Sequence, residues 1–530
     1  MSLFLLTIEQ TAFWLFATAW ATAGSVRVRH AAWRWLIALA ALAPLAMATA
    51  MTAALWRLAK GNATITFPLE FATIAMVLTL FAAVAVIGRG WSRDGGGSRR
   101  AESWRMGALA IAAGAILLAH GMTFWNADLS MRQRIETLRV EAGAAASSLA
   151  PVSVPEPQNA AVVYQETMLL TQTGSPNKEL DEWTTTAGEN PAQLPVEDPQ
   201  LLTYLKRRSE QLQRVREATQ RPVCNFRRDW ARLSVEMLLP ETQALRGIAQ
   251  DLRLSAYVAV AQGRRADALR DVVAMHRLAD HASQEPILVS LLVATAIDHI
   301  AVRSLEHVLL RGAGKWTAED LQPLDDWHAP PIRMRFQTAL RMEEAFGTAT
   351  FCQILNGDTD ARVLESVPSN VNFLGGPAAP FYRLFFMSEE VRSYRNLMRQ
   401  AQNRVLATGV TAAENERWFQ AEFDASRLGL LSRLMLPALA SVFKAMNRSE
   451  AMQRLATLAI ALARHRQQYG AYPESLEAWD SNTMVPHDPF VNAPLRMIRR
   501  DDRLVLYSVG PDAVDNQAAG DDLKFELPAP

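Results

Sequence analysis

The stretch LRLSAYVAVAQGRRADALRDVVAMHRLAD, residues 252–280, decides the fold. Apolar residues recur through it at steps of three and four, which is the spacing of amphipathic helices. Gly263 interrupts the pattern, and the polar residues 264–267 after it supply a turn. The residues that would touch across the turn are small or apolar, as close helix packing requires: Ala256, Val260, Ala268, Val272 and Met275. The stretch therefore predicts two helices joined as a hairpin.

In the spacing of its small and apolar residues this hairpin resembles the unit of tetratricopeptide-type repeats. A single unit leaves two interpretations open, tetratricopeptide-like packing or an irregular helical bundle. Helical periodicity recurs from residue 159 to 447, whereas strand-like alternation is almost absent before residue 497. We therefore predict an all-α, helical-repeat-like region at 159–447. Its expected helices are 160–172, 198–219, 235–262, 265–283, 286–311, 318–327, 333–355, 388–408 and 412–445, the last kinked or broken at Pro437.

Residues 1–125 are much more apolar than the rest of the chain. Four apolar runs within them approach the roughly 20 residues that a helix needs to cross a bilayer. These runs are 3–23, 35–55, 67–87 and 106–125. We expect a four-helix transmembrane block at 1–125, followed by a juxtamembrane helix and a proline-containing linker at 126–158.

Arginine residues orient this block. The first and third loops between the apolar runs carry most of its arginines, and the second loop carries only Arg57 and Lys60. The positive-inside rule then places those two loops in the cytoplasm and both termini outside. The expected location is the inner (cytoplasmic) membrane of a bacterium, crossed several times, with the lipid bilayer as a partner and the large C-terminal region extracytoplasmic.

The last part of the chain, 448–530, combines a helix with strands. Residues 452–468 have helical periodicity, residues 472–478 suggest a short helical turn, and strand-like alternation begins near residue 497. An Asp-rich loop at 511–522 follows LVLYSVG, residues 504–510. The order of YGAYPESLEAW, DPFVNAPL, LVLYSVGPD and the acidic loop resembles the C-terminal part of the major pseudopilin of type II secretion. A small pseudopilin-like α+β module is the expected fold.

That resemblance implies a calcium site in the acidic loop. Carried over by position, Asp512 with Asp521 or Asp522 would supply carboxylate ligands. The loop is poorer in glycine than the family's loop, so a solvated acidic turn is the alternative interpretation.

The soluble region also resembles a group of bacterial proteins of unknown function. The shared features lie at scattered positions along the chain, and this resemblance implies no activity. They are Asn159-Ala160-Ala161 with Tyr164, Cys224-Asn225-Phe226 with Asp229-Trp230, Ala266-Asp267-Ala268-Leu269, Glu285-Pro286 and Tyr472-Pro473-Glu474-Ser475-Leu476.

The candidate transition-metal ligands are grouped on two expected helices: His276, Asp280 and His281, then Asp298 and His299. His276 and Asp280 are four residues apart and share a helix face, and these residue types bind zinc or iron. However, His281 lies about 140° around the helix from His276. No HExxH motif is present. A structural role for these side chains is the competing interpretation.

Two further features leave alternatives open. Cys224 and Cys352 both fall in the extracytoplasmic region, where they would either pair as a disulfide or remain as two buried thiols. The charge-rich stretch 333–344 would either line a ligand-binding groove or form an ion-paired surface.

Composition and motifs narrow the function. Lys+Arg and Asp+Glu balance at 54 each, so we expect no nucleic-acid partner. The sequence has no GxSxG, Walker A or CxxC motif. The leading hypothesis is a membrane-anchored extracytoplasmic scaffold with protein partners in the cell envelope, related to a secretion-type assembly. The alternatives are a metal-dependent hydrolase built on the helical region and a small transport component that uses Glu9 and Glu70.

Overall fold

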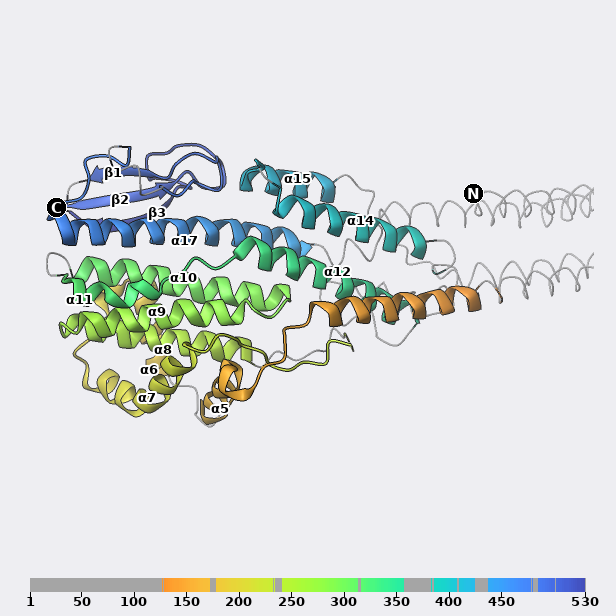
Figure 1. Ribbon diagram of the computed structural model, residues 1–530, viewed down its shortest axis with the longest axis horizontal. Coiled ribbons are helices and arrows are strands. Elements are labelled where there is room, and N and C mark those ends of the chain that lie inside the picture. Colours follow the sequence, from red (N-terminus) through yellow and green to blue (C-terminus); the bar gives the residue numbers. More distant parts are fainter. Residues whose placement is uncertain are drawn as a thin grey trace, which may run out of the picture. The chain divides into compact units, whose positions relative to one another are not determined.

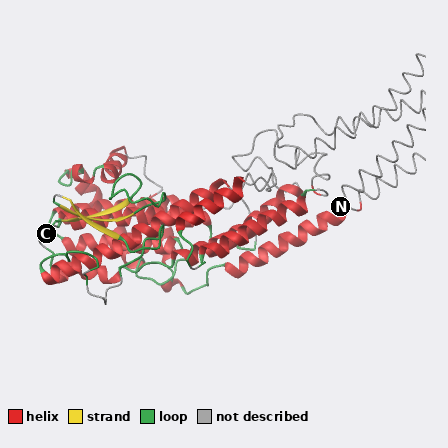
Figure 2. Cartoon of the chain, turned by 90° about the horizontal axis from the view of Figure 1, so that it is seen from above, coloured by secondary structure: helices red, strands yellow, loops and turns green. Residues whose placement is uncertain are grey.

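A computed structural model of the chain is mainly helical, with a small antiparallel sheet at its C-terminal end (Figures 1 and 2). This confirms the coarse prediction of the fold class. The structure describes residues 126, 128–171, 178–231, 233, 241–312, 316–356, 383, 386–407, 409–424, 437–477, 479, 485–500 and 502–529. The four expected membrane spans, 3–23, 35–55, 67–87 and 106–125, together with Glu9 and Glu70, lie outside these residues.

The helices follow the predicted pattern closely. Residues 128–149 are helical, as expected for the juxtamembrane segment. The following elements are η1 (Glu156–Gln158), α5 (Ala160–Thr171), α6 (Lys178–Glu189), η2 (Pro191–Gln193), α7 (Pro199–Ala218), α8 (Glu241–Ala261), α9 (Arg265–Ala282), α10 (Leu288–Arg311), α11 (Ala318–Leu321), η3 (Gln322–Asp326), α12 (Ile332–Asn356), α14 (Met387–Val405), α15 (Ala412–Asp424) and α17 (Pro437–Tyr469).

Two local details differ from the sequence analysis. Helix α6 was not predicted, although Leu180, Trp183 and Ala187 have helical spacing and the last two are buried. Pro437 is the first residue of α17, which agrees with the predicted break at this proline. Residues 472–477 form bends and not the expected helical turn.

The chain divides into two compact units. One holds the described residues of Met1–Glu141, Thr348–Arg395 and Ala425–Met435, and the other holds those of Ala142–Gly347, Asn396–Asp424 and Leu436–Pro530. In the first unit, Arg383 pairs with Asp128 at 2.8 Å. The second unit contains α5 to α11, α15, α17 and the sheet, and it is the one that carries the candidate site.

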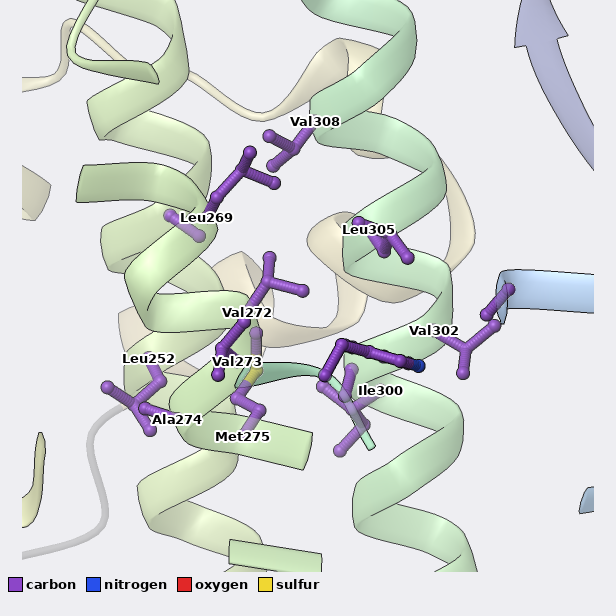
Figure 3. Close-up of a cluster of buried hydrophobic side chains, with 14 of the residues drawn as sticks. Leu252, Leu269, Val272, Val273, Ala274, Met275, Ile300, Val302, Leu305 and Val308 are labelled. Atoms are coloured by element: carbon purple, nitrogen blue, oxygen red, sulfur yellow. The ribbon is translucent and has the colours of Figure 1, made fainter. Parts of the chain in front are cut away.

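The predicted hairpin is present as α8 and α9. Gly263 has a φ of +76° in the connecting turn, a left-handed conformation that glycine adopts without strain. All five residues expected at the contact, from Ala256 to Met275, are buried. The neighbouring helix α10 completes this core, where Leu269 and Val272 of α9 approach Leu305 and Val308 (Figure 3). The apolar periodicity therefore predicted the packing of the hairpin correctly.

Helix α10 is the one described helix that is long and apolar enough to cross a membrane. Inside the structure, however, 61% of its most apolar window is buried. It packs against α8, α9, α17 and β3. In the described residues α10 is thus placed as a core helix.

The C-terminal sheet shares this core. Strands β1 (Arg496–Arg500), β2 (Arg503–Ser508) and β3 (Leu523–Pro528) form an antiparallel sheet in the order β1-β2-β3. The sheet packs on α17 and α10, and Leu504, Leu506, Phe525 and Leu527 join the apolar cluster of α8–α10 (Figure 1). The predicted boundary between 447 and 448 falls inside α17. Sheet and helices are therefore parts of one folding unit.

The Asp488-Pro489-Phe490 motif has a structural role at the end of β2. The Asp488 side chain is fully buried and accepts hydrogen bonds from the Phe490 amide (3.0 Å), the Ser508 hydroxyl (2.9 Å) and the Val509 amide (2.8 Å). Gly510 follows with a φ of +71°, and a Cβ there would overlap the carbonyl oxygen of Asp521. The Asp488 carboxylate thus fixes the loop that leads into the acidic segment.

Candidate functional site

Buried acidic residues hold α7 on the α8–α9 hairpin. Asp251 of α8 accepts a hydrogen bond from the Tyr204 hydroxyl at 2.6 Å and pairs with Arg208. Asp271 of α9 pairs with Arg216 at 2.6 Å. Each carboxylate is thus compensated by an arginine of α7, as buried charges require. These ion pairs explain why Asp251 and Asp271 are buried, which the apolar pattern alone does not.

His276 occupies the middle of α9 with its side chain 3% exposed. Its Nδ1 lies 2.8 Å from Oδ1 of Asp298 on α10, and its Nε2 lies 2.8 Å from the carbonyl oxygen of His328. The indole of Trp327 stacks on the imidazole at a centroid distance of 3.8 Å. His276 therefore joins α9, α10 and the segment 327–331 that leads into α12.

The two partners determine the protons on this side chain. A carbonyl oxygen only accepts hydrogen bonds, so Nε2 must carry a proton. A second proton must lie between Nδ1 and Asp298, because two lone pairs would otherwise face each other across 2.8 Å. Burial disfavours a charged imidazole, but the hydrogen bond and charge of Asp298 outweigh it and raise the pKa of His276 above its ordinary value.

Asp298 is itself held by α17. Its Oδ2 accepts a hydrogen bond from Nε2 of Gln453 at 3.0 Å, and the hydroxyl of Ser449 lies 3.5 Å away. The proton-holding pair of His276 and Asp298 thus connects three helices and one loop segment.

His281, one and a half turns further along α9, has different partners. Its Nδ1 lies 2.8 Å from the hydroxyl of Tyr164, and its Nε2 lies 2.9 Å from the carbonyl oxygen of Arg221. Nε2 therefore donates, and Nδ1 accepts the proton of the phenol, which suits a neutral imidazole. Burial lowers the pKa of His281 to about 4.

Several of the residues that carry the predicted resemblance to a bacterial group of unknown function lie near the C-terminal end of α9. The Asn159 side chain bonds both the amide and the carbonyl of Asn225. The Cys224 amide donates to the Gln284 side chain at 2.8 Å. Arg228 pairs with Glu285 at 2.9 Å and with Glu241. These contacts tie the chain before α5 and after α7 to the end of α9, which gives the motif a structural explanation.

A small pocket with a cavity volume of about 20 Å³ lies beside the His276–Asp298 pair. Residues of α9, α10, α17 and the start of α12 line it. Arg335 of α12 enters it and uses Nη1 to bind Asp280 at 2.6 Å and the Ser283 hydroxyl. Its Nε and Nη2 make no hydrogen bond to any residue that the structure describes.

A second small pocket, also with a cavity volume of about 20 Å³, adjoins the first at Ile332, which lines both. Its walls include Phe336, Phe443 and Met446. Glu450 at its edge binds Arg333 through two contacts of 3.0 Å. The charge-rich stretch that begins at residue 333 thus contributes both an ion pair and pocket-lining side chains, so both interpretations of it apply in part.

The predicted transition-metal residues are not brought together around a vacant centre. Both ring nitrogens of His276 and of His281 are used by protein partners, Asp280 binds Arg335, and His299 is exposed on α10. Within the part of the chain that the structure describes, no group of three or more His, Cys, Asp or Glu side chains is arranged to hold a metal. The structural interpretation accounts for each of these contacts.

The acidic loop uses its carboxylates to bind its own backbone. Asp512 accepts from the Val514 amide at 3.0 Å, and Asp522 accepts from the Ala518 amide at 2.7 Å. Ala518 packs on Val505 and Tyr507 and so covers the outer face of the sheet. Asp521 is exposed. Loop folding thus accounts for Asp512 and Asp522, whereas calcium binding remains a prediction.

Cys224 and Cys352 are both free and buried, and they belong to different units. Burial raises the pKa of both thiols, that of Cys352 to about 12. Burial keeps both thiols protonated, whereas a disulfide between them stays a prediction, because they lie in separate units.

Comparisons of the chain with protein-family models, with curated proteins and with solved structures found no match. The likenesses to a pseudopilin, to tetratricopeptide hairpins and to the bacterial group therefore stay predictions. Sequence reasoning did not find Trp327, Gln453 or Ser449, because nothing in their local sequence distinguishes them from ordinary core residues.

Proposed function

We propose that this protein is a membrane-anchored extracytoplasmic scaffold that binds a segment of a protein partner in the cell envelope. The observation that carries the proposal is the pair of adjoining pockets on either side of Ile332. One is lined by Arg335, whose Nε and Nη2 bond to none of the residues that the structure describes, and the other by Phe336, Phe443 and Met446. Sites between packed helices are common places for ligands.

The chemistry of the two pockets specifies the partner. An extended segment lying across Ile332 would place an acidic side chain against Arg335 and an apolar side chain among the phenylalanines. Arginine favours carboxylates because its N–H groups match them in a planar fork. The expected partner is therefore a protein with an acidic and an apolar residue close together in an exposed segment.

The shared core of helices and sheet supports a scaffold. Leu504 and Phe525 pack in the same cluster as α8–α10, and the Glu526 amide donates to Glu306 of α10 at 2.8 Å. A partner bound at the pockets would thus contact a rigid body that includes the pseudopilin-like sheet. The hydrolase alternative has less support, since His276 and His281 already use both ring nitrogens.

The test is affinity capture of the full-length protein from membranes in mild detergent, with mass spectrometry and metal analysis of the same eluate. Thr295 lines the pocket that contains Arg335, and Thr295→Trp would fill it. Thr185 is exposed on α6 and provides the matched control Thr185→Trp. We expect a reproducible partner whose capture falls at least tenfold with Thr295→Trp alone.

Equal capture by the two variants would place the partner elsewhere and overturn the proposal. A protein that binds no partner and carries stoichiometric transition metal would favour the hydrolase instead.

A further inference from the structure

The segment 327–331 contributes Pro330 to the pocket beside Asp298 and contacts His276 of α9. It connects η3 to α12, and its Pro330 lines the pocket together with Ile332 and Arg335. The polar contact is the bond from Nε2 of His276 to the His328 carbonyl, and Trp327, which is buried in the apolar core, stacks on the imidazole. Both contacts involve the same ring.

We propose that the proton held between His276 and Asp298 is a latch that keeps the segment 327–331 on α9, and that its loss releases this segment. A neutral imidazole has one N–H, so it can serve Asp298 or the His328 carbonyl, but not both. The bond to a carboxylate is the stronger of the two. The remaining proton therefore stays on Nδ1, and the His328 carbonyl loses its donor.

The groups around the His276–Asp298 pair direct the effect of deprotonation to the segment 327–331. With its proton, the pair is neutral overall; without it, a net negative charge stays buried. Asp298 retains Gln453 and Ser449 as donors from α17, so that side of the network persists after deprotonation. The His328 carbonyl makes no other hydrogen bond to a described residue. The weakest member of the network is therefore the loop carbonyl.

Other charged groups nearby are already paired or lie one layer away. Asp280 of α9 favours the charged imidazole but is bound to Arg335 of α12. Asp326 of η3 pairs with Arg277 at 3.1 Å, and His299, next to Asp298 on α10, is exposed. Helix α17 presents the neutral groups Ser449 and Gln453. Asp298 is thus the group that determines whether the proton stays.

The latch bears on the pocket, because opening it frees the wall that carries Pro330. A partner that needs this wall would bind the protonated form, and a partner that needs a wider opening would bind the deprotonated form. The latch itself does not depend on the proposed function, since its test measures the free protein.

Hydrogen–deuterium exchange of the full-length protein in mild detergent tests the latch between pH 6.0 and 9.5. After correction for intrinsic exchange rates, we expect the amide of the buried Trp327, which bonds to the Leu324 carbonyl at 3.2 Å, to lose protection at least tenfold as the pH rises. Amides in the middle of α9 and α10 should keep theirs. Unchanged protection of the Trp327 amide over the whole range would overturn the proposal.

Two variants separate the latch from general destabilisation. Asp298→Asn removes the charge that holds the proton. The asparagine side chain can donate to Nδ1, so a neutral imidazole keeps its N–H on the His328 carbonyl, and the Trp327 amide should stay protected up to pH 9.5. Asp271→Asn is the matched control, because Asp271 is another buried aspartate of α9 that pairs with Arg216 of α7 and not with His276, and it should keep the pH dependence of the unaltered protein. If Asp298→Asn loses protection with rising pH as the control does, the latch is wrong.

Discussion

His276 and His281 show how one helix holds two buried histidines in opposite protonation states. They lie five residues apart on α9, and burial alone would keep both neutral. His276 faces a carboxylate and a carbonyl, so both of its nitrogens carry protons. His281 faces a phenol and a carbonyl, so only one does. The partner at Nδ1 decides between the two outcomes.

The comparison also explains why the two sites affect stability at opposite ends of the pH scale. The pKa of His276 is raised, so its contribution is complete below the ordinary histidine pKa and is lost as the pH rises through the folded-state pKa. The pKa of His281 is lowered, so the folded state resists protonation there. Its stability falls as the pH drops below that ordinary value.

Removal of Asp298 should have the largest effect. Asp298→Ala leaves the imidazole, Gln453 and Ser449 without their shared partner, and breaking a buried pair of this kind costs about 3 kcal/mol. The free energy of unfolding, measured with urea in mild detergent at pH 6, should fall by that amount. The loss of stability above neutral pH should also disappear.

A matched control is Asp325→Ala, which removes an exposed ion pair with Arg464 and should cost less than 1 kcal/mol or so. Similar losses of unfolding free energy for Asp298→Ala and Asp325→Ala would show that the buried His276–Asp298 pair stabilises the fold no more than an exposed ion pair does.

Lowering the pH should show the contribution of His281 to the free energy of unfolding. With a pKa of about 4 in the folded protein and about 6.5 unfolded, this side chain alone should reduce the unfolding free energy by about 3 kcal/mol between pH 6.5 and pH 4. His281→Gln cannot titrate and should flatten this part of the profile. Asp280, whose pKa is lowered, loses its contribution only below its ordinary value and so outside this window. A slope that persists in His281→Gln must come from other groups.

The sequence predicted the helices around these histidines but not their partners. Apolar spacing located α8, α9 and α10, and the angle between His276 and His281 already argued against a joint metal site. The partners of His281 could not be predicted, because Tyr164 lies 117 residues away and Arg221 contributes a backbone carbonyl. The same holds for Asp488, whose buried carboxylate organises the loop after β2 through contacts about twenty residues apart. Periodicity reports which face is buried, whereas polar pairing depends on the tertiary fold.

The smallest effect is expected from Tyr164→Phe, which tests the contact that keeps His281 neutral. Burial raises the pKa of Tyr164, so its hydroxyl keeps the proton that it donates to Nδ1. Tyr164→Phe removes that donor and should cost about 1 kcal/mol at neutral pH. Because a hydrogen bond to the neutral imidazole opposes protonation, its removal should also raise the pKa of His281 and reduce the acid-induced loss of stability. Tyr469→Phe, at an exposed position, should change neither quantity. A steeper acid profile in Tyr164→Phe would mean that the phenol does not hold His281 neutral, and the contrast with His276 would then rest on burial alone.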